Sequence, residues 1–142
     1  MILAPKNLLE QIASHGEAED PHECCGILLG HLEASGQKTL EALIPVSNAR
    51  DEANRHNRFL ITPDELLRGE LQARKQGLDV VGFYHSHPDH PAVPSGYDLD
   101  HAWPTYSYII VSVNHTKAGD LFSWELEADR SHFNPEILKE KK

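Results

Sequence analysis

The segment that most constrains the fold is an apolar run that ends in two histidines. Residues 79–84, Asp-Val-Val-Gly-Phe-Tyr, are rich in β-branched and aromatic side chains and lie between Gly77 and Pro88. This pattern predicts a buried β-strand. His85 and His87 follow at positions i and i+2, so a strand would project both imidazoles from one face, at its carboxyl end. Two imidazoles that can reach a single point could bind one metal ion.

A carboxylate that could complete such a site follows a proline-rich loop. Ser95 and Asp98 have the spacing Ser-x-x-Asp. Two imidazoles and one carboxylate leave one coordination position open for water, and this is the ligand set of a catalytic zinc site, because structural zinc sites usually close all four positions with protein atoms. Each feature also has an ordinary explanation, since His-x-His is common in strands and Ser95 with Asp98 can cap a short helix. Only the combination favours a site.

Hydrolysis of a peptide at zinc also needs a general base, because the attacking water must lose a proton and the leaving amine must gain one. Glu23 is our candidate. It directly precedes the apolar run at 24–32, Cys-Cys-Gly-Ile-Leu-Leu-Gly-His-Leu, and a sheet can bring the start of one strand beside the end of another. The alternative is an exposed acid before a strand, and the sequence alone leaves both open.

The composition limits the classes of function. The chain has 142 residues, enough for one domain, which we expect to span residues 1–142. Asp and Glu outnumber Lys and Arg by 22 to 13, and the formal net charge of -9 disfavours nucleic acid or an anionic membrane as the main partner. Because we find no signal peptide and no apolar segment approaching about 18 residues, we expect a cytoplasmic protein. The adjacent Cys24 and Cys25 are poorly placed for a disulfide, and we expect both to be buried thiols.

Two longer helices are predicted from the spacing of apolar residues, over residues 5–18 and 63–76. The second has Thr62 as its N-cap, Pro63 at its first position and Glu65 at the capping-box position. We expect Leu67 and Leu71 on its buried face.

Strands are predicted over residues 24–32 and 39–46, as an antiparallel hairpin, and over 59–61, 106–113 and 120–127. Residues 47–58 predict a polar loop. A short helix should begin at Ser95 and end before Pro104, and residues from 135 onward predict a short helix or a frayed tail. Together these elements predict an α/β domain with a mixed, largely antiparallel sheet flanked by helices.

Other histidines and the tryptophans have simpler explanations. We expect His90 and His115 to be solvated loop residues. His101, on the same short helix as the candidate carboxylate, could lie next to the metal ligands. Trp103 and Trp124 are expected in the core or in the wall of a cleft.

Three segments together resemble the JAMM signature of the MPN-domain metalloproteases, which reads Glu, then His-x-His-Pro, then Ser-x-x-Asp. They are Glu23 before Cys-Cys-Gly-Ile-Leu-Leu-Gly, His85-Ser86-His87-Pro88, and Ser95-Gly96-Tyr97-Asp98. The match covers nearly the whole chain, and no element of the signature is missing. The resemblance implies the MPN fold, which is cytidine-deaminase-like, and the catalytic branch of the family rather than the metal-less scaffolding branch.

The same resemblance assigns roles to the residues. It implies one Zn²⁺ per chain held by His85, His87 and Asp98, with Glu23 as general base and acid and Ser95 stabilising the oxyanion. It also implies hydrolysis of a peptide or isopeptide bond at the C-terminal tail of a ubiquitin-like protein. Within the family, the compact chain resembles prokaryotic peptidases that process sulfur-carrier proteins of ubiquitin-like fold, including those that release cysteine from a carrier's C-terminus.

Other functions remain open at this point. A binding module could keep the fold and the metal and recognise a ubiquitin-like tail without cleaving it, and a deubiquitinase-like isopeptidase would cleave a conjugate instead. A different zinc hydrolase could act on a small amide or a nucleobase, although the combined His-x-Glu and Cys-x-x-Cys signature of the zinc deaminases is absent. The sequence leaves the identity of the substrate and the existence of a homodimer undecided.

Overall fold

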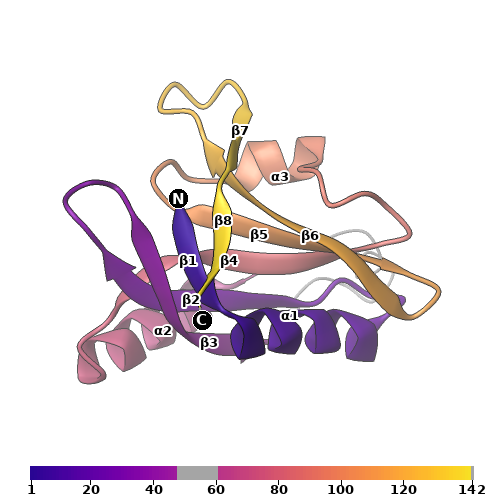
Figure 1. The fold of residues 1–142 in the computed structure, drawn as a ribbon, viewed down its shortest axis with the longest axis horizontal. Coiled ribbons are helices and arrows are strands. Elements are labelled where there is room, and N and C mark those ends of the chain that lie inside the picture. The colour runs from indigo at the N-terminus through magenta and orange to yellow at the C-terminus, as the bar shows by residue number, and fades with distance from the viewer. Residues whose placement is uncertain (48–60, 142) are drawn as a thin grey trace.

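The computed structural model describes residues 1–47 and 61–141 as an eight-stranded sheet with three helices (Figure 1). The strands lie in the sheet in the order β7-β6-β5-β4-β2-β3-β1-β8. Within the described residues, no helix is long and apolar enough to cross a membrane. Along the chain the elements are β1 (Ile2–Pro5), α1 (Lys6–Glu19), β2 (Cys25–Leu32), β3 (Lys38–Val46), α2 (Pro63–Lys75), β4 (Asp79–Pro88), α3 (Gly96–His101), β5 (Ser107–Asn114), β6 (Lys117–Leu126), β7 (Phe133–Glu136) and β8 (Leu138–Lys141).

The sheet is mixed, as predicted. Strand β4 lies at its centre, antiparallel to β2 with Cys25 opposite His85, and parallel to β5 with His87 opposite Ser112. A parallel pair cannot be joined by a tight hairpin and needs a crossover connection. Residues 89–106 provide that crossover and contain α3. The expected hairpin of β2 and β3 is also present, with Cys25 opposite Val46.

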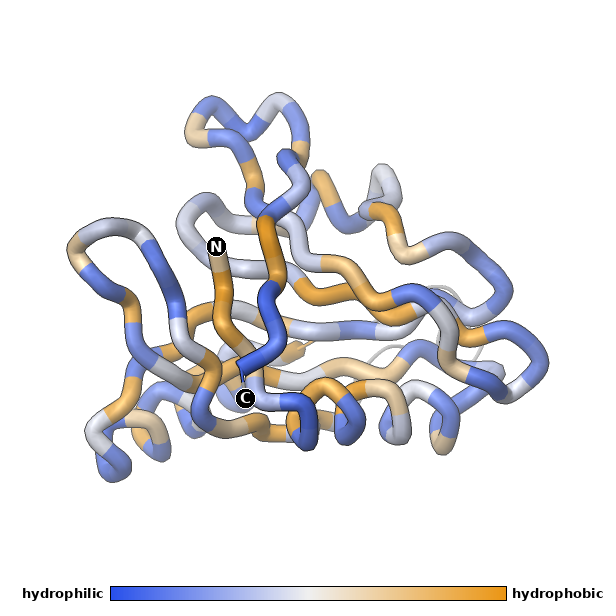
Figure 2. The backbone as a smooth tube through the Cα atoms, in the orientation of Figure 1, coloured by the Kyte–Doolittle hydropathy of each residue, from blue (hydrophilic) through white to orange (hydrophobic). Residues whose placement is uncertain are grey.

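Apolar side chains form one cluster on each face of the sheet. Helix α1 contributes Leu8 and Ile12 to the first cluster, where they join Tyr84 and Val111. Helix α2 contributes Ala73 to the second cluster, which includes Phe83 and Tyr108 from the opposite face of the same strands. Figure 2 shows the apolar segments along the strands and hydrophilic residues at the tips of the hairpins. The two clusters form because side chains at alternate positions of a strand, such as those of β4, point to opposite faces of the sheet.

Helix α2 begins as predicted but buries a different face. The Thr62 hydroxyl accepts a hydrogen bond from the Glu65 N–H at 3.2 Å, and Pro63 is the first helical residue. Leu67 and Leu71 were expected to be buried, and this prediction is wrong, because they are 54% and 47% exposed. The residues of α2 that are buried are Gly69 and Ala73. A Cβ at Gly69 would approach Ile27 Cδ1 to 2.7 Å, so small residues let the helix lie close to the sheet.

The C-terminal segment corrects a second expectation. Residues from 135 onward were expected to form a short helix or a frayed tail, but they belong to β7 and β8. Strand β7 pairs with β6, and β8 pairs with β1, a short strand that the sequence analysis did not predict. The predicted strand at 59–61 and loop at 47–58 lie almost entirely outside the described residues.

The two strands β7 and β8 occupy opposite ends of the strand order although only Ile137 separates them. The sheet must therefore curl until its ends approach. The buried Lys38 of β3 confirms the curvature, because its Nζ donates to Ser107 Oγ of β5 at 2.8 Å and to Glu125 Oε2 of β6 at 3.0 Å. Lys38 Nζ also lies 3.5 Å from Oε2 of the buried Glu136.

Candidate metal centre

The two histidines lie near the carboxyl end of β4, which ends at Pro88. His85 and His87 are 1% and 6% exposed, and the 3.1 Å between their Nε2 atoms shows that both rings aim at one point. The intervening Ser86 projects to the opposite face, where its hydroxyl accepts the Cys24 N–H at 2.8 Å. The alternation expected for a strand therefore places the imidazoles together, as predicted.

Helix α3 supplies the carboxylate. Ser95 is its N-cap, whose hydroxyl accepts the Asp98 N–H at 3.1 Å, while Asp98 Oδ2 accepts the Ser95 N–H at 2.9 Å. This capping box fixes the Asp98 rotamer. The same Oδ2 lies 3.2 Å from His85 Nε2 and 3.1 Å from His87 Nε2. Asp98 is thus both a helix-capping residue and a neighbour of the histidines, so the two explanations weighed for it are compatible.

These three donor atoms form a nearly equilateral triangle with the dimensions of a tetrahedral metal site. Zinc bonds to nitrogen and oxygen of about 2.0–2.1 Å place two tetrahedral ligands roughly 3.4 Å apart. The observed separations of 3.1–3.2 Å are close to that value. The donor set of two imidazoles and one carboxylate also suits zinc, so the residues present fit the ion that the sequence implies.

Hydrogen bonding determines which nitrogen of His87 faces the triangle. His87 Nδ1 lies 2.8 Å from the Pro91 carbonyl oxygen, which can only accept, so Nδ1 carries a hydrogen. In the neutral ring, Nε2 then has a free lone pair directed at the other two donor atoms. A ligating histidine generally has such a partner on its second nitrogen.

The charges of the cluster are coupled. Burial lowers the pKa of His85, despite the opposing charge of Asp98. Burial would also lower the pKa of His87, but its hydrogen bond to Asp98 and the charge of that carboxylate raise it above the usual value. Burial tends to raise the pKa of Asp98, yet the two histidines hold it well below its ordinary range. Asp98 is therefore ionised at neutral pH, as a metal ligand must be.

Glu23, two residues before the start of β2, approaches the histidines. It is 4% exposed, and one carboxylate oxygen lies within 4.8 Å of a ring nitrogen of each of His85 and His87. Two contacts set this approach, because the Cys24 N–H donates to Ser86 Oγ and the Ser86 N–H donates to the Cys24 carbonyl at 3.2 Å. The proximity that the sequence could only suggest is therefore present. Glu23 is a buried acid beside the cluster and not an exposed one.

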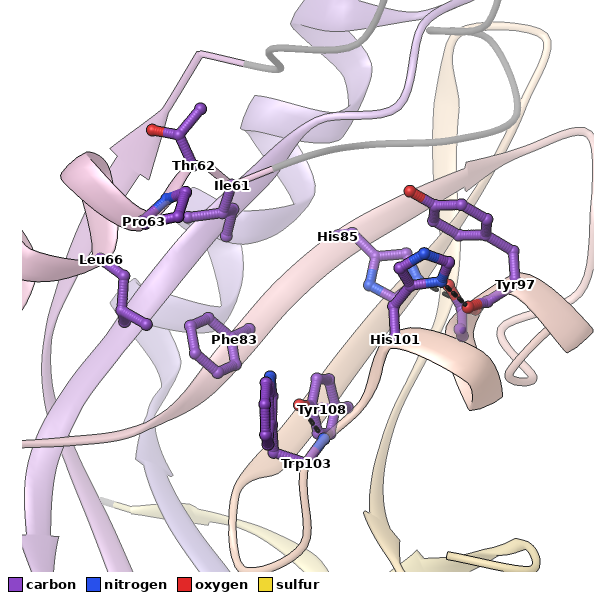
Figure 3. Close-up of a pocket in the computed structure, with 11 residues that line it drawn as sticks. Ile61, Thr62, Pro63, Leu66, Phe83, His85, Tyr97, His101, Trp103 and Tyr108 are labelled. Carbon is purple, nitrogen blue, oxygen red and sulfur yellow. Dashed lines mark hydrogen bonds and ion pairs between the residues drawn. The ribbon is translucent and has the colours of Figure 1, made fainter.

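Two pockets flank the cluster. The first has a volume of about 330 Å³, includes His85 and Asp98, and has mostly apolar walls (Figure 3). Its other lining residues are Ile61, Thr62, Pro63, Leu66, Phe83, Tyr97, His101, Trp103 and Tyr108. The second pocket includes Glu23, His87 and Ser95. Tyr97 lines both pockets, so the two hollows adjoin at this residue of α3.

The remaining candidates are placed as follows. The His101 ring stacks on Tyr97 at 4.1 Å and lines the first pocket, and Figure 3 shows both rings beside His85. Trp103 is 61% exposed and forms part of the wall of the first pocket. A cleft wall was one of the two positions predicted for it. His90 and His115 are exposed, as predicted. The sequence analysis did not identify Tyr97, whose only signal is its position between Ser95 and Asp98.

Cys24 and Cys25 are buried free thiols, as predicted. Burial raises the pKa of the Cys24 thiol to about 12 and raises that of Cys25 as well. Neither thiol is ionised near pH 7, so neither is a ready nucleophile.

Comparison with known proteins identifies the family. Residues 5–127 match the model of the prokaryotic homologues of the JAB domain. The chain belongs to this family. The JAB-domain chain is 38% identical over 123 residues to a protein named desampylase from Haloferax volcanii, with 80% of this chain and 85% of that protein covered. It is 29% identical over 118 residues to a Thermus thermophilus protein named "Probable TtuB-protein conjugate cleaving protease", with coverage of 83% and 74%.

A solved structure supports the fold. The JAB-domain chain matches a JAB1/MPN domain protein from Archaeoglobus fulgidus with a TM-score of 0.59 and 19% identity, over 100% of this chain and 97% of that one. At this identity the similarity shows the fold alone. The MPN fold and the family membership expected from the three signature segments are both confirmed.

Proposed function

We propose that this JAB-domain chain is a zinc-dependent peptidase that hydrolyses a peptide or isopeptide bond at the C-terminal tail of a ubiquitin-like sulfur-carrier protein. The observation that carries the proposal is the convergence of His85 Nε2, His87 Nε2 and Asp98 Oδ2 within 3.2 Å of one another, beside the buried Glu23. The names of the two relatives, a desampylase and a conjugate-cleaving protease, support a substrate of this class.

His85, His87 and Asp98 would hold the zinc. Glu23 is the alternative third ligand, because its carboxylate lies within 4.8 Å of the ring nitrogens of both histidines, whereas Asp98 Oδ2 lies 3.1–3.2 Å from both Nε2 atoms. The near-tetrahedral spacing of Asp98 with the two histidines favours Asp98 as ligand and leaves Glu23 as proton carrier. When bound, zinc polarises the scissile carbonyl and lowers the pKa of the attacking water.

The chain's own residues then move protons and stabilise charge. Glu23 accepts a proton from the attacking water and returns it to the leaving nitrogen, a role that typically contributes about 10²–10⁴-fold in rate. The Ser95 oxygen already accepts the Asp98 N–H, so its O–H remains available to donate to the developing oxyanion. Because Glu23 and Ser95 line the same pocket, both groups can reach one reacting centre.

The first experiment measures zinc per chain in protein purified without chelator, for the wild type and for His87→Ala. We expect about one zinc in the wild type and almost none in the variant, because the variant loses one of three protein ligands. A folded wild type that contains no zinc and does not take up added zinc would contradict the proposal.

The second experiment separates an enzyme from a binding module. Glu23→Gln should retain its zinc but lose cleavage of a carrier-protein conjugate by at least about 100-fold, because an amide cannot carry the proton. A variant that cleaves at the wild-type rate would exclude Glu23 as the base, and a wild type that binds the tail without turnover would indicate a binding module.

The name of the Thermus thermophilus relative refers to a protein conjugate, so the first substrate to test is the carrier joined by an isopeptide bond to a lysine of another protein. A linear fusion of the carrier tail to a short peptide is the matched control. Faster cleavage of the conjugate would identify an isopeptidase, and faster cleavage of the fusion would identify a peptidase that processes the carrier itself.

A further inference from the structure

The loop that follows β4, residues 89–94, is held by three side chains in succession. The His90 carbonyl accepts from Ser112 Oγ at 2.7 Å, and the Ala92 carbonyl accepts from Trp124 Nε1 at 3.0 Å. Between them, the Pro91 carbonyl accepts from His87 Nδ1 at 2.8 Å. Three consecutive carbonyls of this proline loop therefore each have a side-chain donor, and the central donor is a candidate zinc ligand.

The composition of the proline loop explains why side chains hold it. Pro91 and Pro94 have no N–H group, so the loop cannot form a regular series of its own backbone hydrogen bonds. Its backbone contacts lie at its start, where Asp89 N–H donates to the Val113 carbonyl at 2.7 Å. From His90 to Ala92 the position of the backbone depends on the donors that its carbonyls meet.

The two outer donors are well placed to fix the central carbonyl. Ser112 lies opposite His87 in the pairing of β4 and β5, so the serine and the ligand project from the same face of neighbouring strands. Trp124 lies on β6, is partly buried, and reaches the loop where Ala92 is 2% exposed. Both donors therefore come from ordered strands.

We propose that Ser112 and Trp124 are positioning residues for the metal centre. By anchoring the carbonyls on either side of Pro91, they hold the Pro91 oxygen where it orients the His87 ring and keeps the hydrogen on Nδ1. His87 Nε2 then stays directed at His85 and Asp98. This inference rests on the proposed function, because it concerns the affinity of the same zinc site.

Single substitutions can remove each donor. Trp124→Phe removes the Nε1–H, which is the only hydrogen-bonding group of the indole, and keeps an aromatic ring. Ser112→Ala removes one hydroxyl. The matched control is Ser107→Ala, which removes a buried hydroxyl from the same strand, where its partner is Lys38 and not the proline loop.

The experiment measures the zinc dissociation constant of the wild type and the three variants by competition with a chromophoric chelator. Loss of an outer partner of a metal ligand typically weakens binding by about 10–100-fold, and we expect about 10-fold for Ser112→Ala and for Trp124→Phe because they act one step further away. Ser107→Ala should bind zinc like the wild type, even if it melts at a lower temperature.

A second readout follows the His87 ring itself. In the zinc-loaded wild type, ¹⁵N NMR of labelled histidine should show His87 with its hydrogen on Nδ1. Trp124→Phe and Ser112→Ala should show a mixture of tautomers, which a general loss of stability would not produce.

The outcomes are distinguishable. A wild type that binds zinc, together with Ser112→Ala and Trp124→Phe variants of unchanged affinity and unchanged tautomer, would overturn this inference and leave the proposed function intact. A wild type that does not bind zinc would overturn the proposed function and this inference with it. If Trp124→Phe does not fold, Ser112→Ala decides alone by the same two measurements.

Discussion

At the scale of single residues, Asp98 shows how one side chain can serve the fold and the site together. Its Oδ2 accepts the Ser95 N–H at the start of α3 and faces both histidine Nε2 atoms. The backbone bond restricts the carboxylate before any metal arrives, so little rotamer entropy remains to be lost on binding. An acidic residue at this helix position therefore satisfies a rule of helix capping and also suits the proposed zinc site.

Asp98→Asn should separate the two roles. The amide oxygen can still accept the Ser95 N–H, so the zinc-free variant should be more stable than Asp98→Ala by about 1 kcal/mol. Zinc affinity should fall by at least about 100-fold in both variants, because the anionic ligand is lost. Chelator competition and thermal unfolding in EDTA measure the two effects. Wild-type zinc affinity in Asp98→Asn would show that Asp98 is not a ligand.

At the scale of elements, the sequence predicted what depends on local patterns. The Thr62 cap of α2 and the strand leading to His85 were confirmed, because capping signals and apolar runs act within a few residues. The buried face of α2 was predicted wrongly because hydropathy favours leucine, whereas the sheet requires small residues at Gly69 and Ala73. That requirement comes from Ile27, a residue distant in sequence.

The same limit explains the elements and pocket walls that the sequence did not indicate. Strands β1, β7 and β8 have four residues each and are stabilised by pairing with distant partners. The first pocket combines Leu66 of α2, Phe83 of β4 and Tyr108 of β5 with the connecting residue Trp103. Such sets are fixed by topology, and no local signal marks them. The positions of the candidate ligands were predictable because their spacing within a strand and a helix start is itself local.

Substitutions on α2 should reflect its observed face. Ala73→Leu should reduce the free energy of unfolding by about 1–3 kcal/mol, because it adds volume where the helix touches the sheet. Leu71→Gln should change it by less than about 0.5 kcal/mol, because Leu71 is largely exposed. Urea denaturation measures both. The reverse ranking would show that Leu71 is the buried residue.

At the scale of the whole molecule, the curled sheet depends on a buried ionic cluster. Lys38 from β3 reaches Ser107, Glu125 and Glu136, which lie on three other strands. Lys38 and Glu136 have almost no exposed side-chain surface. Removal of one partner of a buried pair leaves the other charge uncompensated, and this cost usually exceeds what the pair contributed. The cluster therefore couples strands that are not neighbours in the sheet.

Lys38→Met should lower the free energy of unfolding by roughly 3 kcal/mol, because it keeps the volume and leaves the buried Glu136 with only the partly exposed N-terminal ammonium of Met1, at 3.5 Å, as a cationic partner. Lys139→Met, at an exposed position on β8, is the matched control and should change stability by less than about 0.5 kcal/mol. The zinc affinity of the folded Lys38→Met protein should equal that of the wild type, because the cluster shares no residue with the metal centre. Equal stability of the two variants would contradict the proposed role of Lys38.

The placement of β7 and β8 also bears on self-association. A sheet presents unpaired backbone groups only along its outermost strands, and those strands can template pairing with another chain. In the sheet formed by the described residues, both outermost strands fall within residues 133–141, and each is four residues long. One contains Pro135, which cannot donate a backbone hydrogen bond, and the other carries Lys139 and Lys141, charges that oppose stacking. The short segment that completes the sheet therefore also gives both of its edges features that disfavour pairing with another chain.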